Sequence, residues 1–193
     1  MGLSFSFLVY SRTGTIDLSR PTEPQEADAV MHRLFPRTPY RRGSSRRLLD
    51  VCFPPRPTPA VGVFEDGVLI ATRDAHLYDP PILNPRYFKL DEWAEIRLLT
   101  AYSVNDMFAY GHWSASNLVR SFSVNATAGV WDDTGSPEEF EGVRPVGDER
   151  WLELCNAALA SSLNLAGDAG PRLANPVDWD DVALYTYARA DRP

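Results

Sequence analysis

Cysteine and histidine are scarce in this sequence, which limits metal chemistry. The 193-residue chain has two cysteines, Cys52 and Cys155, far apart, and three scattered histidines. Zinc sites need three or four such ligands at close spacings, so we expect neither a metal site nor a cofactor. Two separated thiols are instead typical of small core residues in a reducing compartment, which favours a cytoplasmic location.

Long apolar runs and targeting segments are missing as well. No stretch approaches the ~18 consecutive apolar residues of a membrane helix, so no membrane association is expected. The first residues carry neither a charged region nor the small-residue cleavage site of a secretory signal. Glycine-rich phosphate loops of the Walker and Rossmann forms are also missing. These absences predict a soluble globular protein without a catalytic signature.

Lysine is nearly absent, because 18 of the 19 basic residues are arginines and one is Lys89. Together with abundant alanine, proline, aspartate and valine, this usage is typical of a GC-rich genome. A high arginine content by itself is therefore weak evidence of function. The 26 acidic residues give the chain a net charge of −7. Because phosphate contacts need positive charge, nucleic acid is not expected as a partner.

What the sequence does contain is a set of apolar patterns that predict a single domain over residues 1–193. The predicted fold is α+β, with a mainly antiparallel sheet of about six or seven strands and helices packed on one face. Residues 36–47 and 54–59 are predicted to be Arg- and Pro-rich loop segments. The predicted strands span residues 4–10, 48–53, 60–71 (a hairpin around Asp66-Gly67), 107–133 and 182–189, and the predicted helices span residues 24–35, 91–100 and 148–163.

The most distinctive stretch is an aromatic β-meander over residues 107–133. Turns at residues 114–117 and 125–128 place Arg120 opposite Gly111 on one side and Asp133 on the other. Glycine leaves room for the guanidinium, and Trp113 lies diagonally close enough to stack on it. A charge on an apolar face should be paired. We therefore predict an Arg120–Asp133 ion pair that fixes the strand register.

A second interpretation gives Arg120 a binding role. In this interpretation the guanidinium lines a pocket for an anionic ligand or for the carboxylate of a partner protein. Geometry separates the two interpretations, because a guanidinium that is fully paired inside the protein excludes the pocket.

His112 and Tyr110 lie together on the other predicted face of the meander. Ser121 and Ser123 share that face and Asp106 precedes it, so a Ser-His-Asp arrangement can be drawn. Triads are recognised by geometry and not by residue types, and no nucleophile or orienting group is evident at hairpin distance. A half-exposed structural histidine is the favoured interpretation. A hydrolase centred on His112 is the last alternative, and no catalytic residue is assigned.

Six arginines from Arg33 to Arg47 locally reverse the negative charge of the chain. Guanidinium groups at these spacings can clamp a phosphate or face an acidic partner. A solvated loop of biased composition is the plainer interpretation. The acidic residues at 132–133, 138–141 and 178–181 are likewise interpreted as surface loops. The arginines that remain binding candidates are Arg41, Arg42, Arg46 and Arg47.

Residues 105–141 resemble a known family. They read Asn-Asp-Met-Phe-Ala-Tyr-Gly-His-Trp (105–113), Leu-Val-Arg-Ser-Phe-Ser (118–123), Gly-Val-Trp-Asp-Asp-Thr-Gly (129–135) and Glu-Phe-Glu (139–141). This pattern resembles an uncharacterised family of actinobacterial domains and, more loosely, bacterial toxin-immunity proteins. The Arg-rich and Pro-rich segments match poorly. Because the family has no assigned activity, the resemblance implies fold and lineage and transfers no catalytic residue.

Two functions are open at this point. The first is a non-enzymatic binding domain that acts by protein–protein contact, immunity-like or regulatory. The alternative is an anion- or nucleotide-binding module that uses the Arg33–Arg47 segment or Arg120. A protein partner or a small anionic ligand is therefore expected, and the oligomeric state is left open. The binding candidates are Arg120, Asp133, Trp113, His112, Tyr110 and the four arginines of the Arg-rich segment.

Overall fold

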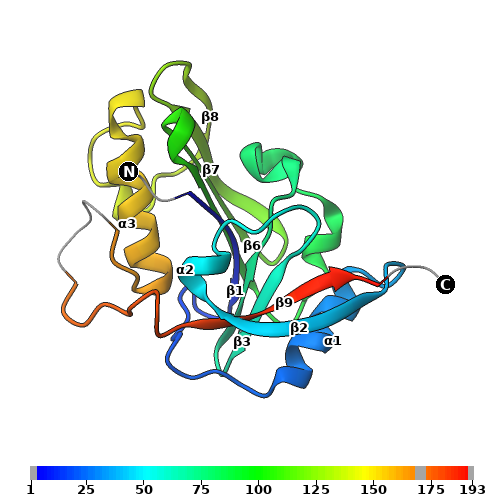
Figure 1. The fold of residues 1–193 in the computed structure, drawn as a ribbon. Coiled ribbons are helices and arrows are strands. Elements are labelled where there is room, and N and C mark those ends of the chain that lie inside the picture. The colour runs from blue at the N-terminus through cyan, green and yellow to red at the C-terminus, as the bar shows by residue number, and fades with distance from the viewer. Residues whose placement is uncertain (1–3, 168–172, 191–193) are drawn as a thin grey trace.

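A computed structural model of the protein describes residues 4–167 and 173–190. These residues form one antiparallel nine-stranded sheet in the order β2-β9-β3-β4-β1-β5-β6-β7-β8, with helices packed around it (Figure 1). The strands are β1 (Phe5–Ser11), β2 (Tyr40–Arg47), β3 (Ala60–Phe64), β4 (Gly67–Ala71), β5 (Glu95–Tyr102), β6 (Met107–Ser114), β7 (Asn117–Asn125), β8 (Gly129–Gly135) and β9 (Ala183–Arg189). The α-helices are α1 (Pro24–Leu34), α2 (Leu48–Val51) and α3 (Trp151–Leu163). Short 3-10 turns are η1 (Ala75–Tyr78), η2 (Pro80–Ile82), η3 (Pro85–Phe88), η4 (Ser103–Asn105), η5 (Glu139–Glu141) and η6 (Asp148–Arg150).

The middle of the sheet is buried on both faces. Every residue of β1 is buried, with Phe7 and Val9 in one apolar cluster and Leu8 and Tyr10 in the other. Strands covered on both faces have nearly continuous apolar sequences instead of a two-residue alternation. The two clusters make one core on each side of the sheet.

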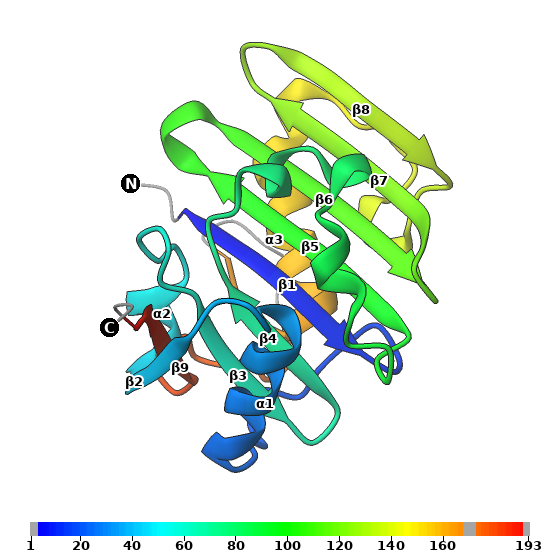
Figure 2. The same cartoon turned by 90° about the vertical axis from the view of Figure 1, so that its right-hand side faces the viewer.

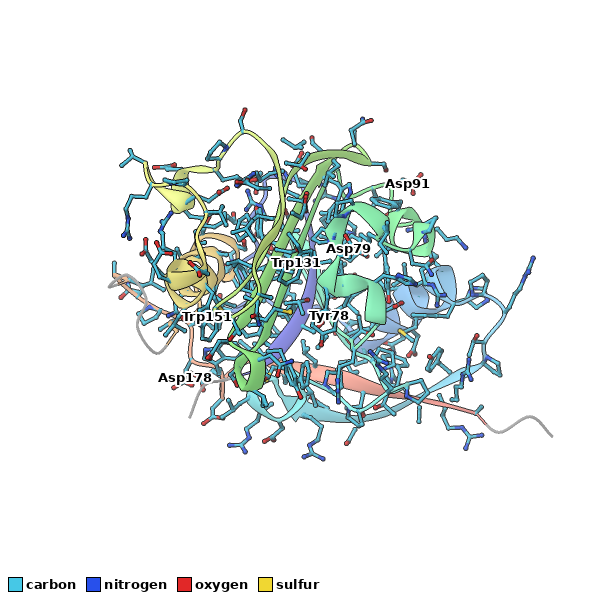
Figure 3. All side chains as sticks on the ribbon, turned by 90° about the horizontal axis from the view of Figure 1, so that it is seen from above. Tyr78, Asp79, Asp91, Trp131, Trp151 and Asp178 are labelled. Atoms are coloured by element: carbon cyan, nitrogen blue, oxygen red, sulfur yellow. The ribbon has the colours of Figure 1, made fainter. Side chains whose placement is uncertain are left out.

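Helices cover both faces of the sheet, so the prediction of helices on one face is wrong. Helix α3 packs on one face through Leu154, Ala158 and Leu159, whereas α1 packs on the other through Val30 and Met31. Figure 2 shows α1 in front of the sheet and α3 behind it. From above, Trp151 of α3 lies on one side of the sheet, and Tyr78 and Asp79 lie on the other (Figure 3). The helices are thus divided between the two faces of the sheet.

The predicted number of about six or seven strands is also wrong. Residues 91–100, predicted as a helix from the spacing of Trp93, Ile96 and Leu99, include most of the central strand β5. Both faces of β5 are covered, so its buried apolar residues change from one face (Ile96, Leu98) to the other (Leu99, Ala101) and the two-residue alternation is interrupted. Residues 40–47, predicted as loop, form the edge strand β2, which is too polar to show an apolar alternation.

Other predicted elements are present. The first strand, the hairpin of β3 and β4, the meander of β6 to β8 and the last strand are confirmed. Helices α1 and α3 are confirmed as well, whereas residues 48–53 begin with the short helix α2 instead of a strand. The correct segments have either a clear alternation or a helical period together with turn residues.

The structure shows where the two cysteines lie and whether any helix could span a membrane. Cys52 and Cys155 are both buried, and burial raises the pKa of the Cys52 thiol to about 11, so that the unreactive protonated thiol dominates at neutral pH. Among the described residues, no helix is both long enough and apolar enough to cross a membrane.

Candidate functional site

A β-bulge in β7 positions the candidate residues of the meander. Trp113 of β6 pairs with Leu118, but His112 pairs with Arg120, so Val119 is an extra residue in β7. The predicted pairing of Arg120 with Gly111 is therefore wrong by one residue. A shift of one residue moves the following side chains to the opposite face of a sheet. The bulge thus brings Arg120 onto the same face as His112.

Arg120 is 1% exposed, and all three nitrogens of its guanidinium donate within the protein. Nε and Nη2 donate to the two carboxylate oxygens of Glu141, at 2.8 and 2.6 Å. Nη1 donates to Asp133 Oδ1 at 2.6 Å and to the carbonyl oxygen of Thr134 at 3.0 Å. The predicted Arg120–Asp133 ion pair is present, but the predicted register is wrong by two residues, because Arg120 lies opposite Gly135 and Asp133 lies opposite Phe122. Because the guanidinium is paired inside the protein, it does not serve as a ligand-binding group.

The predicted stacking of Trp113 on Arg120 is wrong. Trp113 lies on the opposite face, edge-on to Phe88 at 5.8 Å between ring centroids. The aromatic ring near the guanidinium is that of Phe122, at 5.3 Å. Gly111 makes room for Trp113, since a Cβ at Gly111 would lie 2.4 Å from the tryptophan ring.

His112 lies in a second charged cluster beside Arg120. Its Nε2 contacts Glu95 Oε2 at 2.6 Å, and its Nδ1 contacts Glu138 Oε1. Ser114 Oγ donates to Glu95 at 2.7 Å, and Arg97 pairs with Glu138 at 3.3 Å. Two positive and two negative side chains thus form a closed network that joins β5, β6 and the chain after β8.

The network favours the charged forms of its members. Burial lowers the pKa of His112, but hydrogen bonds to Glu138 and Glu95 raise it by more, so the net shift is upward. Burial raises the pKa of Glu95 and of Glu138, but their hydrogen bonds with His112 lower both pKa values overall. These shifts, together with a carboxylate at each ring nitrogen, favour a protonated imidazole held between two carboxylates.

The hydrolase interpretation of His112 is not supported by this geometry. Both ring nitrogens are occupied by carboxylates, so neither is available to accept a proton from a nucleophile. Ser121 pairs with Gly111 and Ser123 with Ala109, which places both serines on the face opposite His112. Among the described residues, no group of three or more histidine, cysteine, aspartate or glutamate side chains is arranged to hold a metal ion.

We predict that the His112 network makes the stability of the protein depend on pH. A histidine whose folded pKa is raised stabilises the fold fully below its unfolded pKa of about 6.5, and this contribution is lost as pH rises through the folded pKa. Glu95 and Glu138 act in the opposite sense, because their contributions are lost as pH falls through their lowered folded pKa values. Urea unfolding of the native protein and of His112→Gln over a pH series measures the difference. The difference in free energy of unfolding should shrink above neutral pH, and a pH-independent difference would contradict the prediction.

Two basic side chains of the sheet hold residues 138–150, the 138–150 segment, in place, and a third basic side chain lies within the segment and ties it together. His112 binds Glu138 and Arg120 binds Glu141, whose Oε1 also accepts from the backbone N–H of Glu138 at 2.8 Å. Arg150 donates to the carbonyl oxygens of Glu141, Arg144 and Pro145 at 2.7 to 2.8 Å. The interpretation of 138–141 as a surface loop is therefore wrong, because Glu141 is buried. These contacts indicate that residues 105–141, which carry the family resemblance, have a structural role.

A different region of the molecule is hollowed. Three adjoining cavities, of about 320, 510 and 670 Å³, surround the connection between α1 and β2, and Phe35 lines all three. Ligand pockets commonly have volumes of 300–1,000 Å³. Tyr40 packs edge-on against Phe35 at 5.2 Å, so an aromatic pair lies where the cavities meet. We call this region the arginine groove.

Positive charge is concentrated in the arginine groove. Two carboxylates line it, Asp28 and Asp74, and Asp28 is paired with Arg42 at 3.0 Å. Arg86 lies over the ring of Phe35 at 5.2 Å. The basic residues that line the three cavities are Arg37, Arg41, Arg42, Arg56, Arg73, Arg86, Lys89 and Arg189. This sign is opposite to the net charge of −7 of the whole chain.

Several of these cations lack an acidic partner. Arg37, Arg41 and Arg189 make no ion pair with any side chain in residues 4–167 and 173–190. Arg73 lies over the ring of Phe53 at 4.2 Å, and its backbone carbonyl accepts from Arg56 Nε at 2.5 Å. Stacked and unpaired guanidinium groups keep their N–H donors available to an anion.

The predicted Arg33–Arg47 segment is divided by the structure. Arg33 is paired with Asp91 and Glu92 outside the groove. Arg46 and Arg47 lie at the far end of β2, where Asp50 and Asp180 pair with them. Of the four candidates, Arg41 and Arg42 remain in the groove. The sequence gives no indication of Arg56, Arg73 or Arg86, because they reach the groove from other loops.

The fold and the two charged regions define an open-sheet protein with an internal ion-pair network toward one edge and a basic groove toward the other. The chain belongs to a family of unknown function, DUF6928, whose model matches residues 5–187. No curated protein and no solved structure matches the chain. The expected resemblance to an uncharacterised family is thus confirmed, and the match carries no information on an actinobacterial source or on toxin-immunity proteins.

Proposed function

We propose that this protein is a binding domain that holds an anionic ligand in the arginine groove. The observation that carries the proposal is the lining of the groove, in which eight basic side chains face two carboxylates in a chain of net charge −7. Concave surfaces lined by one sign of charge concentrate ligands of the opposite sign. The proposal combines the Arg-rich segment with basic residues of the loops around Arg56 and Arg86.

The chemistry of the groove suits recognition better than catalysis. Guanidinium groups bind carboxylates and phosphates through paired hydrogen bonds, and Phe35 and Tyr40 offer an apolar surface between them. His112, Glu95 and Glu138, whose pKa values are shifted, lie in the His112 network instead. The groove therefore offers several N–H donors to an anion, as recognition requires.

We predict that multivalent anions stabilise the protein against heat. The probes are inorganic phosphate, pyrophosphate, ATP and citrate, each raised in steps in differential scanning fluorimetry. A ligand at 100 times its dissociation constant adds about 2.7 kcal/mol to the free energy of unfolding. The double variant Arg37→Gln/Arg41→Gln should lose most of this shift, because it removes two unpaired cations from the groove.

The matched control is Arg46→Gln/Arg47→Gln, which makes the same charge change in the same part of the sequence but outside the groove. These two side chains are 55% and 56% exposed. The control should keep the anion-induced shift. Equal shifts in both variants would assign the effect to nonspecific charge screening and would refute the groove as a binding site.

Protein–protein contact, of a regulatory or immunity-like kind, is the second candidate function. The observation that favours it is the edge strand β2, which borders the arginine groove and ends the sheet. Exposed sheet edges are common sites of partner binding.

A further inference from the structure

Strand β2 forms an open edge of the sheet. Within the described residues β2 pairs with β9 and with no other strand. A terminal strand presents backbone N–H and C=O groups along its outer side, which can pair with another extended chain. Figure 1 shows β2 beside β9 at the outside of the molecule. The edge is eight residues long, from Tyr40 to Arg47.

The two terminal strands of the sheet carry opposite charges. The edge strand β2 contains four arginines and no acidic residue. The other terminal strand, β8, contains Asp132 and Asp133 and no basic residue. Like charges opposite each other destabilise a strand pair, so two copies of β2 would repel each other. A strand that pairs with β2 should instead be acidic.

The open edge is continuous with the arginine groove. Tyr40, Arg41 and Arg42 are the first residues of β2, and all three line the largest of the three cavities. The pairing of β2 with β9 is irregular between Arg42 and Ser45. A chain that follows the edge toward Tyr40 therefore enters the groove near Phe35.

We propose that the anionic ligand is an extended acidic segment of a partner protein, which pairs with β2 as an added strand and continues into the arginine groove. This inference rests on the proposed function of the groove. Main-chain hydrogen bonds along β2 supply affinity. Carboxylates on one face of the added strand supply specificity by pairing with Arg41 and Arg46, which share a face because they lie opposite Ala188 and Leu184. The irregularity at residues 43–44 divides the edge into two short runs, residues 40–42 and 45–47, so the partner should pair on either side of it.

The test uses a synthetic peptide in which glutamate alternates with valine and threonine. One control peptide has glutamine in place of glutamate, and another has the same sequence with N-methyl groups at alternate residues, which block main-chain pairing. We expect the acidic peptide to bind in fluorescence anisotropy, and both controls to bind roughly tenfold more weakly or worse. Amide hydrogen exchange of residues 40–47 should slow when the acidic peptide binds.

The outcomes distinguish this inference from the proposed function. If pyrophosphate stabilises the protein but the N-methylated peptide binds as well as the unmodified one, the edge is not used and only the groove proposal stands. The same conclusion follows if the acidic peptide does not bind at all. If neither small anions nor the peptide binds, both proposals fail. If sedimentation velocity shows self-association that the acidic peptide abolishes, β8 of a second copy occupies the edge, and the inference of a separate partner is overturned.

Discussion

Replacing Arg120 by methionine is expected to lower the free energy of unfolding by about 3–5 kcal/mol. The substitution leaves Glu141 buried without its bidentate partner, and an unpaired buried charge is the main source of the cost. The contact with Asp133 contributes less, because that side chain is 46% exposed and water replaces the lost hydrogen bond. Typical domains have a total stability of about 5–15 kcal/mol, so the variant should be partly unfolded at moderate urea concentrations. Urea unfolding followed by tryptophan fluorescence measures the change.

Two matched variants make this prediction decisive. In Arg120→Met/Glu141→Gln the buried charge is removed with its partner, and the glutamine oxygen can still accept from the backbone N–H of Glu138. This double variant should recover at least part of the lost stability, because removing both partners costs less than removing one. Arg144→Met breaks an exposed ion pair with Glu153 and should cost at most about 1 kcal/mol. A loss for Arg120→Met no larger than for Arg144→Met would contradict the structural role of Arg120.

Replacing Gly135 by alanine is the second change with a large expected effect. Gly135 ends β8 with a φ of +87°, and a Cβ there would lie 2.0 Å from the carbonyl oxygen of Val119. The left-handed conformation costs alanine roughly 1–2 kcal/mol, and the steric overlap adds about 1–3 kcal/mol. The overlap is with backbone and not with a flexible side chain, so β7 and β8 must separate at the bulge. We expect a loss of about 2–5 kcal/mol in urea unfolding.

Gly129→Ala is the control for Gly135→Ala. Gly129 begins the same strand with a φ of +82°, and a Cβ there would meet nothing within 4 Å. The control therefore carries the conformational cost alone, and the difference between the two variants measures the close approach of β8 to Val119. Equal losses would show that the contact at Gly135 is not needed for the register of the meander.

The fold was predictable from the sequence where the local pattern is complete. The hairpin of β3 and β4 has two apolar runs joined by a turn at Asp66, and α1 has its apolar residues on one helical face. Strands β2 and β5 were not predictable in this way. β5 buries apolar residues on both faces, so its alternation breaks after Leu98, and β2 is polar on both faces; neither keeps the two-residue period that identifies a strand.

Strand register predicted part of the ion-pair network but not all of it. The ion pair between Arg120 and Asp133 could be predicted because the two residues lie on neighbouring strands joined by a short turn, although they are not directly opposite each other. No glycine in the sequence indicates the bulge at Val119. Because of the bulge, the neighbour of Arg120 on its face is His112 and not Trp113. The role of Glu141 was missed for a different reason, since its side chain reaches Arg120 from beyond the sheet. Whether an acidic residue that follows a strand is exposed or pairs with a buried cation cannot be decided until its spatial neighbours are known.

Local sequence patterns do not predict the arginine groove. Its basic residues come from the connection after α1, from the Pro-rich segment near Arg56, from the loop at Arg86 and from the last strand. The sequence shows the excess of arginines in residues 33–47, but that segment divides between the groove and ion pairs elsewhere. Long-range packing decides which arginines share a cavity.

Titration of the protein with pyrophosphate, followed by the backbone amide resonances in NMR, tests the binding role of the groove most directly. Binding in the groove should shift resonances of the non-proline residues in 37–42, 56–58, 72–74 and 86–87 and of Lys89, which line the cavities, and leave the 138–150 segment unchanged. Shifts centred on His112 and the 138–150 segment would contradict the account, because they would place the binding site in the network that is assigned here to structure.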